Sequence, residues 1–263
     1  SFPIFISKTF WLYFVFAYVF VASVTPVWAL LQPRDYLNSF LLIAMMVAGF
    51  FGILVARPEI NLPAFTAFTV NGQTMFPMLF VTIACGAVSG FHSLVSSGTT
   101  SKQISNEQDM LPISFGAMLL ESFLAVISLV AVGALALNGT LPQGTPPVVF
   151  ATAISGFLAT LGIPTLTAYT IITLAVSAFA LTSLDSVARV GRLAFQELFM
   201  DSQTDEAQMK LWLKVVTNKH FATLATLLLS YLLAIGGYQN IWPLFGSANQ
   251  LLSALALSAL AVF

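Results

Sequence analysis

The stretch PMLFVTIACGAVSGFHSLVSSGTT (residues 77–100) decides the fold class that the sequence predicts. It begins as an apolar run, from Pro77 to Val88, and turns to glycine, histidine, serine and threonine before a membrane span of about 20 residues is complete. Hydrocarbon contains no water to satisfy loose backbone groups, so an interrupted helix is tolerated only where protein or a water-filled cavity surrounds it. The stretch therefore predicts a discontinuous helix within a bundle of membrane helices.

The composition of the whole chain supports this class. Of its 263 residues, 58% are hydrophobic and only 7% are charged, whereas soluble domains carry about 25% charged residues. We therefore predict an all-α, polytopic membrane protein. A net charge of −1 without a basic block argues against nucleic-acid binding. One cysteine excludes an intrachain disulfide and a cysteine-based metal site.

Seven apolar segments are long enough to cross a bilayer as helices. They are residues 9–31, 38–56, 77–97, 110–137, 165–187, 220–237 and 245–263. A shorter apolar segment, 148–163, contains two glycines and predicts a re-entrant or interfacial hairpin; a full eighth span is the alternative. The chain starts without methionine and ends inside an apolar run, so we expect residues 1–263 to be a single transmembrane domain fragment of a longer polypeptide.

The distribution of lysine and arginine orients the predicted spans. The loop 188–219 is rich in both, so the positive-inside rule places it in the cytoplasm. Its basic residues are Arg189, Arg192, Lys210, Lys214 and Lys219. Within this loop we expect an interfacial helix that begins near Thr204.

Glu121 lies in the middle of the predicted span 110–137, where a carboxyl group costs about 2.5–3.5 kcal/mol or more. At helical spacing it shares a face with the small residues Ser114, Ala117, Ala125 and Ser128. We therefore expect Glu121 to point into a helix bundle and to act as a proton relay or a cation ligand. A structural glutamate, protonated or hydrogen-bonded, is the alternative.

Further polar residues lie near the cytoplasmic end of the predicted span 165–187. Thr182, Ser183 and Asp185 offer oxygens of the kind that bind hard cations such as Na⁺, so all three are candidates for ion or proton coupling. Thr182 and Ser183 lie deeper in the span and are the better ion ligands. For Asp185 taken alone we favour the alternative, an i,i+4 ion pair with Arg189.

The segment LLQPRDYLNS (residues 30–39) joins the first two predicted spans through a turn at 32–37, where Pro33 ends or kinks the helix. Arg34 and Asp35 in this turn are candidates for an inner gate that exchanges partners with Asp185. A positive-inside anchor with a local ion pair is the alternative.

The segment WPLFGSANQ (residues 242–250) contains a proline and a glycine, which predict a tight outer turn. Asn249 and Gln250 then enter the last span, where we expect their amides to hydrogen-bond across helices.

The opening stretch also supplies the candidate substrate site. A helix broken inside the membrane exposes a positive N-terminal end and a negative C-terminal end, which bind anions and cations. We expect residues up to about Thr100 to be unwound and residues 101–109 to form a cytoplasmic turn. The candidate substrate-binding residues are Gly90, His92, Ser93, Ser96, Ser97, Gly98, Thr99 and Thr100. An ordinary packing helix rich in glycine and serine is the alternative.

Four segments carry a family resemblance. They are SVTPVWALLQPRDYLNSFLL (23–42), GFHSLVSSGTTSKQI (90–104), ALTSLDSVARVGR (180–192) and WPLFGSANQLLSALAL (242–257). In this order they resemble the signature segments of the carbon starvation protein A family of bacterial inner-membrane transporters. The resemblance implies uptake of peptides or pyruvate, coupled to protons, during nutrient limitation.

The resemblance also implies a fold, the LeuT-like inverted-repeat architecture, of which this chain would hold the second repeat. The broken helix 77–97 would open that repeat, and its partner would lie in a missing N-terminal part. In this plan Thr182 and Ser183 resemble the hydroxyl ligands of a sodium site, which a proton-driven mechanism would leave unused.

We therefore predict a secondary active transporter, not an enzyme, in the bacterial inner membrane. It would bind a small-molecule substrate, a peptide or pyruvate, and use no cofactor beyond a coupling Na⁺ or H⁺. Membrane lipid and a small accessory protein are its candidate partners. Three alternatives stay open: a passive channel with a re-entrant filter, a transporter of another small carboxylate or amino acid, and a membrane enzyme, which would need clustered catalytic groups.

Overall fold

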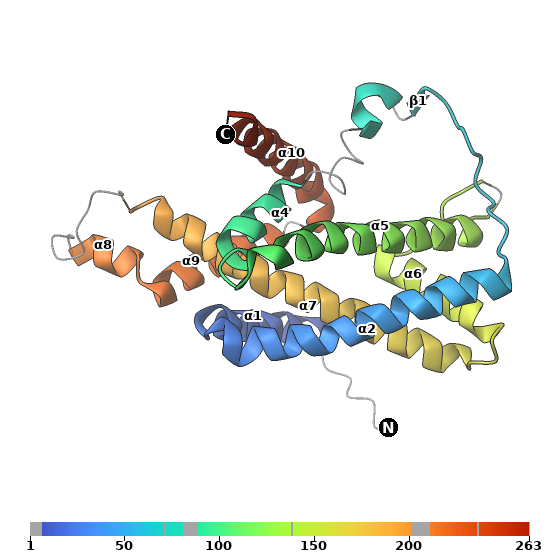
Figure 1. Cartoon of the computed structure of the whole chain (residues 1–263), viewed down its shortest axis with the longest axis horizontal. Helices are drawn as coiled ribbons and strands as arrows, with labels where there is room; N and C mark the ends of the chain where they lie inside the picture. Colours follow the sequence, from blue (N-terminus) through green and yellow to red (C-terminus); the bar gives the residue numbers. More distant parts are fainter. Residues whose placement is uncertain are drawn as a thin grey trace. The chain divides into compact units, whose positions relative to one another are not determined.

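The computed structural model of the chain describes residues 7–70, 72–80, 89–137, 139–200, 211–235 and 237–262, most of which are helical (Figure 1). The helices are α1 (Lys8–Val24), α2 (Val27–Ala56), α4 (Gly90–Val95), α5 (Met110–Leu135), α6 (Pro146–Ala159), α7 (Thr165–Glu197), α8 (Leu211–Val216), α9 (Lys219–Ile235) and α10 (Tyr238–Val262). Short π-helical turns η1 (Met75–Leu79) and η2 (Ser96–Thr100), and a 3-10 turn η3 (Glu107–Asp109), accompany them. Strands β1 (Thr69–Val70) and β2 (Gln73–Thr74) form an antiparallel hairpin.

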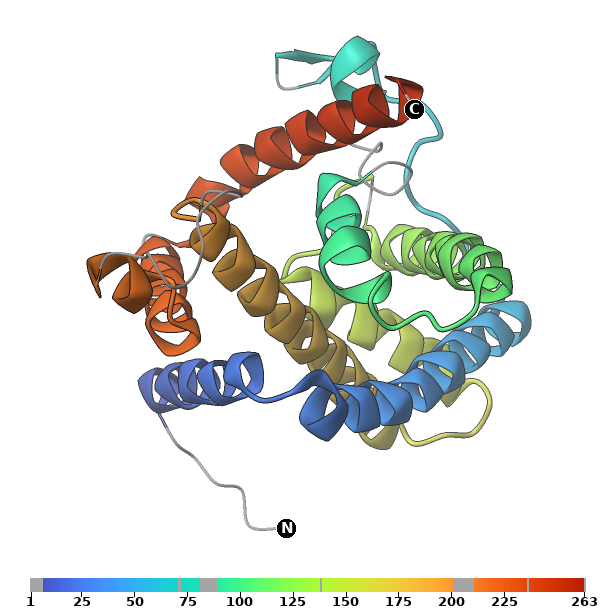
Figure 2. The ribbon, with the colours of Figure 1, turned by 60° about the vertical axis from the view of Figure 1, so that its left-hand side comes forward.

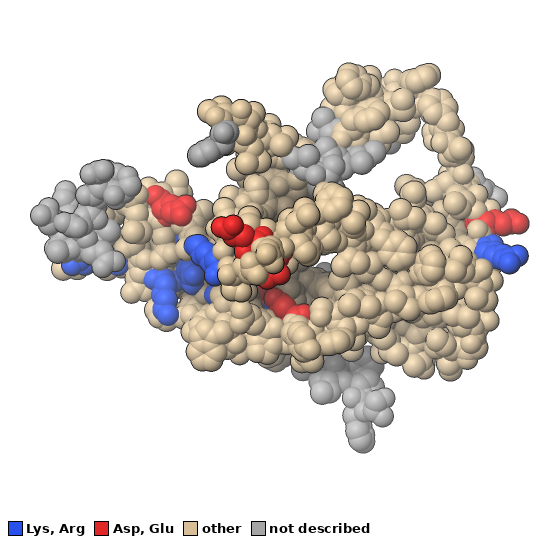
Figure 3. Space-filling model, viewed as in Figure 1, with Lys and Arg blue, Asp and Glu red and all other residues tan. Residues whose placement is uncertain are grey.

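Four of the described helices are long and apolar enough to cross a membrane. They cover Val27–Ala56, Glu107–Leu135, Thr165–Glu197 and Leu244–Val262, and α1, α6 and α9 add shorter apolar helices. Acidic and basic side chains cover little of the face shown in Figure 3, and many large apolar side chains are exposed. The prediction of an all-α membrane protein is confirmed.

The chain divides into two compact units. Unit 1 consists of residues 1–34, 90–103 and 181–263, and unit 2 of residues 35–89 and 104–180. Within unit 1, α1 packs beside α9 and α4 packs beside α10 (Figure 2). Within unit 2, α5 packs beside α6. The boundaries lie inside α2 and α7, so each of these two helices contributes to both units.

The core of unit 2 is apolar and is built around α6. Ile154 is fully buried and belongs to a cluster with Ile127 of α5 and Phe157. A Cβ added to Gly49 of α2 would lie 3.1 Å from Ile127 Cγ2, and one added to Gly52 would lie 3.1 Å from the Cβ of Phe157. Because lipid is as apolar as these side chains, close van der Waals packing through small residues holds such helices together.

Residues 148–163 differ from the predicted hairpin. The structure has one helix, α6, which begins after extended Thr145 with Pro146 at its first position, where proline is favoured. Of the two glycines taken as breakers, Gly156 lies inside the helix and only Gly162 adopts a left-handed conformation, at φ +85°. The segment is therefore a buried packing helix followed by a short connection to α7.

The first two predicted spans are divided at another place. The sequence predicts a turn at 32–37, but the chain breaks at Thr25–Pro26 and α2 runs from Val27 through Pro33. Thr25 is extended (φ −69°, ψ 145°), as residues before proline prefer. Pro33 removes one hydrogen bond from α2 without ending it.

Other predicted boundaries shift as well. Helix α7 continues past 187 to Glu197, so the predicted cytoplasmic loop 188–219 starts as helix. The interfacial helix is described only from Leu211, and Thr204 lies outside the described residues. Helix α10 begins directly after left-handed Gly237, so 242–250 is helical rather than a turn. Residues 81–88, in the first half of the predicted span 77–97, also lie outside the described residues.

Candidate functional site

Charged side chains are buried in unit 1 where α1, the start of α2 and α7 meet. Asp185 of α7 has no exposed surface and Arg189, one turn further along, is 7% exposed. At helical spacing, both positions share one face of α7 with buried Ala175. Charged groups at this depth in an apolar helix require partners, because an unpaired buried charge is costly.

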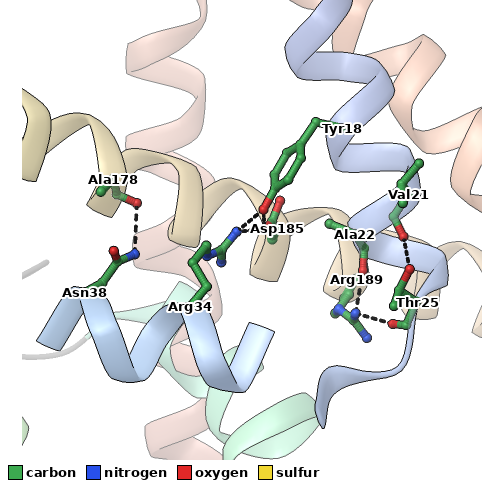
Figure 4. Close-up of polar contacts among 9 residues, drawn as sticks. All are labelled: Tyr18, Val21, Ala22, Thr25, Arg34, Asn38, Ala178, Asp185 and Arg189. Carbon is green, nitrogen blue, oxygen red and sulfur yellow. Dashed lines mark hydrogen bonds and ion pairs between the residues drawn. The ribbon is translucent and has the colours of Figure 1, made fainter. Parts of the chain in front are cut away.

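Asp185 is paired through one of its two carboxylate oxygens. Its Oδ2 accepts from Arg34 Nη1 in an ion pair and from the Tyr18 hydroxyl at 3.2 Å (Figure 4). Arg34 Nη1 also donates to the Tyr18 hydroxyl oxygen at 2.5 Å, so the three groups close a ring of hydrogen bonds. The other oxygen, Oδ1, is buried and has no hydrogen-bond partner among the residues that the structure describes.

The guanidinium of Arg189 binds backbone carbonyls, and the ion pair described for Asp185 is the one with Arg34. Arg189 Nη2 donates to the carbonyl oxygens of Ala22 and Thr25, each at 2.5 Å (Figure 4), and Arg192 Nη1 donates to the carbonyl of Ser23, also at 2.5 Å. These carbonyls are the last of α1. In a continuous helix the carbonyl of Ala22 would accept from residue 26, but a proline there has no N–H.

The buried cluster carries more positive than negative charge. Among the contacts described, Arg34 pairs with the carboxylate of Asp185, whereas Arg189 and Arg192 bind backbone carbonyls of Ala22 and Ser23. The C-terminal end of a helix carries a partial negative charge, so the end of α1 stabilises the two arginines of α7 that bind it. Arg34 is therefore the cation that forms an ion pair with Asp185.

The candidate substrate stretch 90–100 is helical rather than unwound. Helix α4 begins at Gly90 and continues into the π-helical turn η2. The Ser93 hydroxyl donates to the Gly90 carbonyl at 2.6 Å and the Ser97 hydroxyl to that of Leu94 at 3.2 Å. Hydroxyls bonded to their own helix satisfy backbone carbonyls locally, so no unwinding is needed to accommodate these serines.

The start of α4 is held by α10. The Phe91 N–H donates to Asn249 Oδ1 at 2.7 Å, which confirms the predicted amide bond across helices. A Cβ at Gly90 would overlap the Asn249 carbonyl oxygen and Leu252. Glycine is therefore required at position 90 by a close helix crossing.

The predicted substrate residues differ in exposure. His92, Ser96 and Ser97 are exposed, whereas Gly90 is buried. The remaining ones, Ser93, Gly98, Thr99 and Thr100, are intermediate. Beyond them, Gln103 Nε2 donates to the Thr99 carbonyl at 3.4 Å, and its Oε1 accepts from Gln32 Nε2 at 3.2 Å. The stretch thus ends beside the segment of α2 that carries Arg34.

The coupling candidates are not gathered in one site. Glu121 lies in unit 2 and is exposed, outside the apolar core of that unit. The buried face of α5 runs through Ile127 and Ala131, which lie about a third and about a quarter of a turn around the helix from Glu121. Thr182 is half-buried and Ser183 exposed, whereas Asp185, the less favoured of the three, is fully buried. Asp35 is half-buried in unit 2.

Sequence reasoning did not identify Tyr18. It also did not identify the binding of Arg189 and Arg192 to carbonyls at the end of α1. Pro26 was the available signal, because it leaves the Ala22 carbonyl without its helical donor. Nothing local marks Tyr18 as a partner of Asp185. Within the described residues no group of three or more His, Cys, Asp or Glu side chains could hold a metal ion.

Comparison with known proteins identifies a family that the sequence matches. The model of the family described as carbon starvation protein CstA matches residues 2–141 and 136–263. The chain is 36% identical to the peptide transporter CstA of Escherichia coli (strain K12), over 93% of this chain and 44% of that protein.

Two further relatives are similar. The peptide transporter CstA of Bacillus subtilis (strain 168) is 34% identical over 91% of this chain and 46% of its own length. The pyruvate/proton symporter BtsT of Escherichia coli is 48% identical over 49% of this chain and 19% of its own length. The chain thus spans less than half the length of these relatives, and no solved structure matches it.

Proposed function

The chain belongs to the carbon starvation protein CstA family, and on that premise we propose that it works as a secondary active transporter that imports short peptides or pyruvate together with protons or sodium. It is a multi-pass protein of the bacterial inner membrane. The substrates are proposed from the names of the relatives, two of which are peptide transporters and one a pyruvate/proton symporter.

The buried ion pair between Arg34 and Asp185 carries this proposal. It joins two helices, α2 and α7, that are long and apolar enough to cross a membrane. Ionisable residues inside membrane helices are expensive and mark transport pathways, proton relays and gates. We propose that the pair is an inner gate, as the sequence suggested for Arg34, Asp35 and Asp185.

We place the substrate against the exposed residues of α4 and η2. His92, Ser96 and Ser97 are accessible there, and the end of this stretch is hydrogen-bonded through Gln103 to Gln32, two residues before Arg34. The proposed substrate stretch and the proposed gate therefore lie on neighbouring segments of unit 1.

A LeuT-like inverted repeat is the architecture that we propose. Its support is the order of elements: a helix that begins at Gly90, a long helix α5, the buried α6, the polar helix α7, and then α9 and α10. A structure of the intact protein should contain a second segment related to 77–100 by a two-fold axis in the membrane plane. A bundle without such a symmetry would disprove this architecture.

Uptake by proteoliposomes tests the transport function. The intact protein, reconstituted into vesicles, should accumulate labelled pyruvate or a short peptide against its concentration gradient when a proton or sodium gradient is imposed. Uptake that only equalises the two concentrations would indicate a passive channel. No uptake above that of empty vesicles, for every substrate tried, would refute the proposal.

A further inference from the structure

The two oxygens of the Asp185 carboxylate have different surroundings. Oδ2 accepts both hydrogen bonds, from Arg34 and from Tyr18. Oδ1 is buried without a hydrogen-bond partner in the described part of the chain. A proton can therefore bind at Oδ1 without displacing either donor, because both donors contact the other oxygen.

We propose that Asp185 Oδ1 is the site of the coupled proton and that Arg34, once Asp185 is neutral, binds the carboxylate of the substrate. This inference rests on the proposed transport function and makes it more specific. One O–H bond forms at Oδ1 with a proton taken from a hydronium ion of the solution, which becomes water, and no bond of the substrate is made or broken. The charge that Arg34 faces in this structure is thereby replaced by the charge of the substrate.

The exposure of the two partners supports this order of events. The Asp185 side chain has no exposed surface, whereas that of Arg34 is 19% exposed. An incoming anion therefore reaches Arg34 first and does not need to enter the space around Asp185. Charge-assisted bonds between guanidinium and carboxylate are about twice as strong as neutral ones, so protonation of Asp185 favours the exchange.

The chemistry of Arg34 selects the substrate class. Pyruvate and short peptides share one feature, a carboxylate at the end of a small molecule. A guanidinium group binds such a carboxylate through two parallel hydrogen bonds. One proton would then accompany each carboxylate, and sodium would have no place in the exchange because a tethered cation already occupies the position beside Asp185.

The neighbours of Asp185 are accounted for on each element that the described structure packs against it. Tyr18 faces it from α1, Arg34 faces it from α2, and Arg189 follows it on α7. Arg189 is engaged by the end of α1. Asp185 is thus the acidic group that the described contacts give Arg34, and a change in its charge changes how strongly it holds Arg34.

Binding of labelled pyruvate to the purified intact protein at a series of pH values tests the proposal. Where Asp185 of the substrate-free wild type is ionised, affinity should fall tenfold for each unit of rising pH, because one proton binds with each pyruvate. Asp185→Asn mimics the protonated state, so its affinity should be independent of pH and equal to that of the wild type at low pH. Its uptake should no longer respond to a proton gradient, while exchange of labelled for unlabelled pyruvate persists.

Glu197→Gln is the matched control. It makes the same change of acid to amide on the same helix, at an exposed position about 18 Å further along its axis. This variant should keep the full pH dependence. Pyruvamide, which lacks the carboxylate, should fail to compete with pyruvate for the wild type.

Proton uptake by the wild type provides a second measurement if Asp185→Asn does not fold. One proton should be taken up from a weakly buffered solution for each pyruvate bound. If no proton is taken up, Asp185 is not protonated on binding. A folded Asp185→Asn variant with the pH dependence of the wild type also overturns the proposal, while the transport function stands. If the wild type neither binds nor imports pyruvate or peptides, the transport function itself fails.

Discussion

Helices α5 and α6 of unit 2 meet through apolar and small side chains, whereas α1, α2 and α7 meet in unit 1 through an aspartate, a tyrosine and arginines. In unit 2, Ile127 and Ile154 pack where Gly49 of α2 allows a close approach, and Phe157 packs against Gly52. In unit 1, Arg34 binds Asp185 and Arg189 binds the end of α1. Apolar packing is sufficient to associate helices in lipid, so the buried charges of unit 1 are not needed for that purpose.

The difference separates a structural contact from a functional one. A buried ion pair is often no more stabilising than apolar residues of the same shape, yet breaking it by removing one partner is costly. We therefore expect variants of the buried charges of unit 1 to alter stability and transport together, and variants of the apolar core of unit 2 to alter stability alone.

Loss of one partner of the ion pair should have the largest effect. Arg34→Met leaves the Asp185 carboxylate buried without its cation, which costs about 3–5 kcal/mol. Unfolding of the purified intact protein in detergent measures this loss. The double variant Arg34→Met/Asp185→Leu should regain most of the stability but remain inactive in uptake. An Arg34→Met protein as stable as the wild type would show that the pair is not buried in the membrane-embedded protein.

A cavity in unit 2 should have a smaller effect and spare the mechanism. Ile154→Ala removes a fully buried side chain and should cost about 2 kcal/mol, near the lower end for such changes because lipid competes for the same apolar surface. The pH dependence of uptake should be unchanged in the protein that remains folded. Leu166→Ala, at an exposed position, is the control and should be as stable as the wild type. A changed pH dependence of uptake in Ile154→Ala would show that the apolar core of unit 2 affects transport as well as stability.

The hydrogen bonds from Arg189 to the end of α1 should contribute less to stability than the packing of Ile154. Arg189→Met leaves the carbonyls of Ala22 and Thr25 without their donor. Pro26→Ala restores a backbone N–H that can donate to the Ala22 carbonyl. The loss caused by Arg189→Met should therefore be smaller by about 1 kcal/mol in the Pro26→Ala background. A double-mutant cycle on unfolding free energies measures this coupling. Additive effects would mean that the proline does not create the need for the arginine.

Glu121→Gln should have the smallest effect. Glu121 is exposed in unit 2, so its stability change should stay within about 0.5 kcal/mol. If Asp185 binds the coupled proton, the pH dependence of uptake should also be unchanged. Loss of that dependence in a folded Glu121→Gln protein would move the proton site to unit 2.

The local features of the chain were predictable to different degrees. Helices appear at each apolar segment that the structure describes, because hydropathy is a property of neighbouring residues. Their ends were harder to predict. Pro33 was expected to end or kink a helix and lies inside α2, while the actual break lies at Thr25–Pro26. Proline disfavours a helix without forbidding it, and a buried partner for the orphaned carbonyl decides where the break is tolerated.

The candidate site was predictable as a set of residues but not as an arrangement. Arg34 and Asp185 were both named, and their exchange of partners was considered, yet Thr182 and Ser183 were preferred as ligands. Depth along the helix favoured those two residues, but rotation about the helix axis decides burial. Ser183 faces outward and Asp185 inward on the same helix.

The sequence by itself determined the class of this protein: an all-α membrane protein whose polar residues stand out against an apolar background and whose signature segments match one transporter family. The tertiary structure alone decided which polar groups meet. Arg34 lies 151 positions from Asp185, and Tyr18 lies 167 positions from it. No local pattern encodes such contacts, because they depend on how helices pack and rotate. The same packing leaves one oxygen of Asp185 without a donor among the described residues, and this oxygen is where we place the proton.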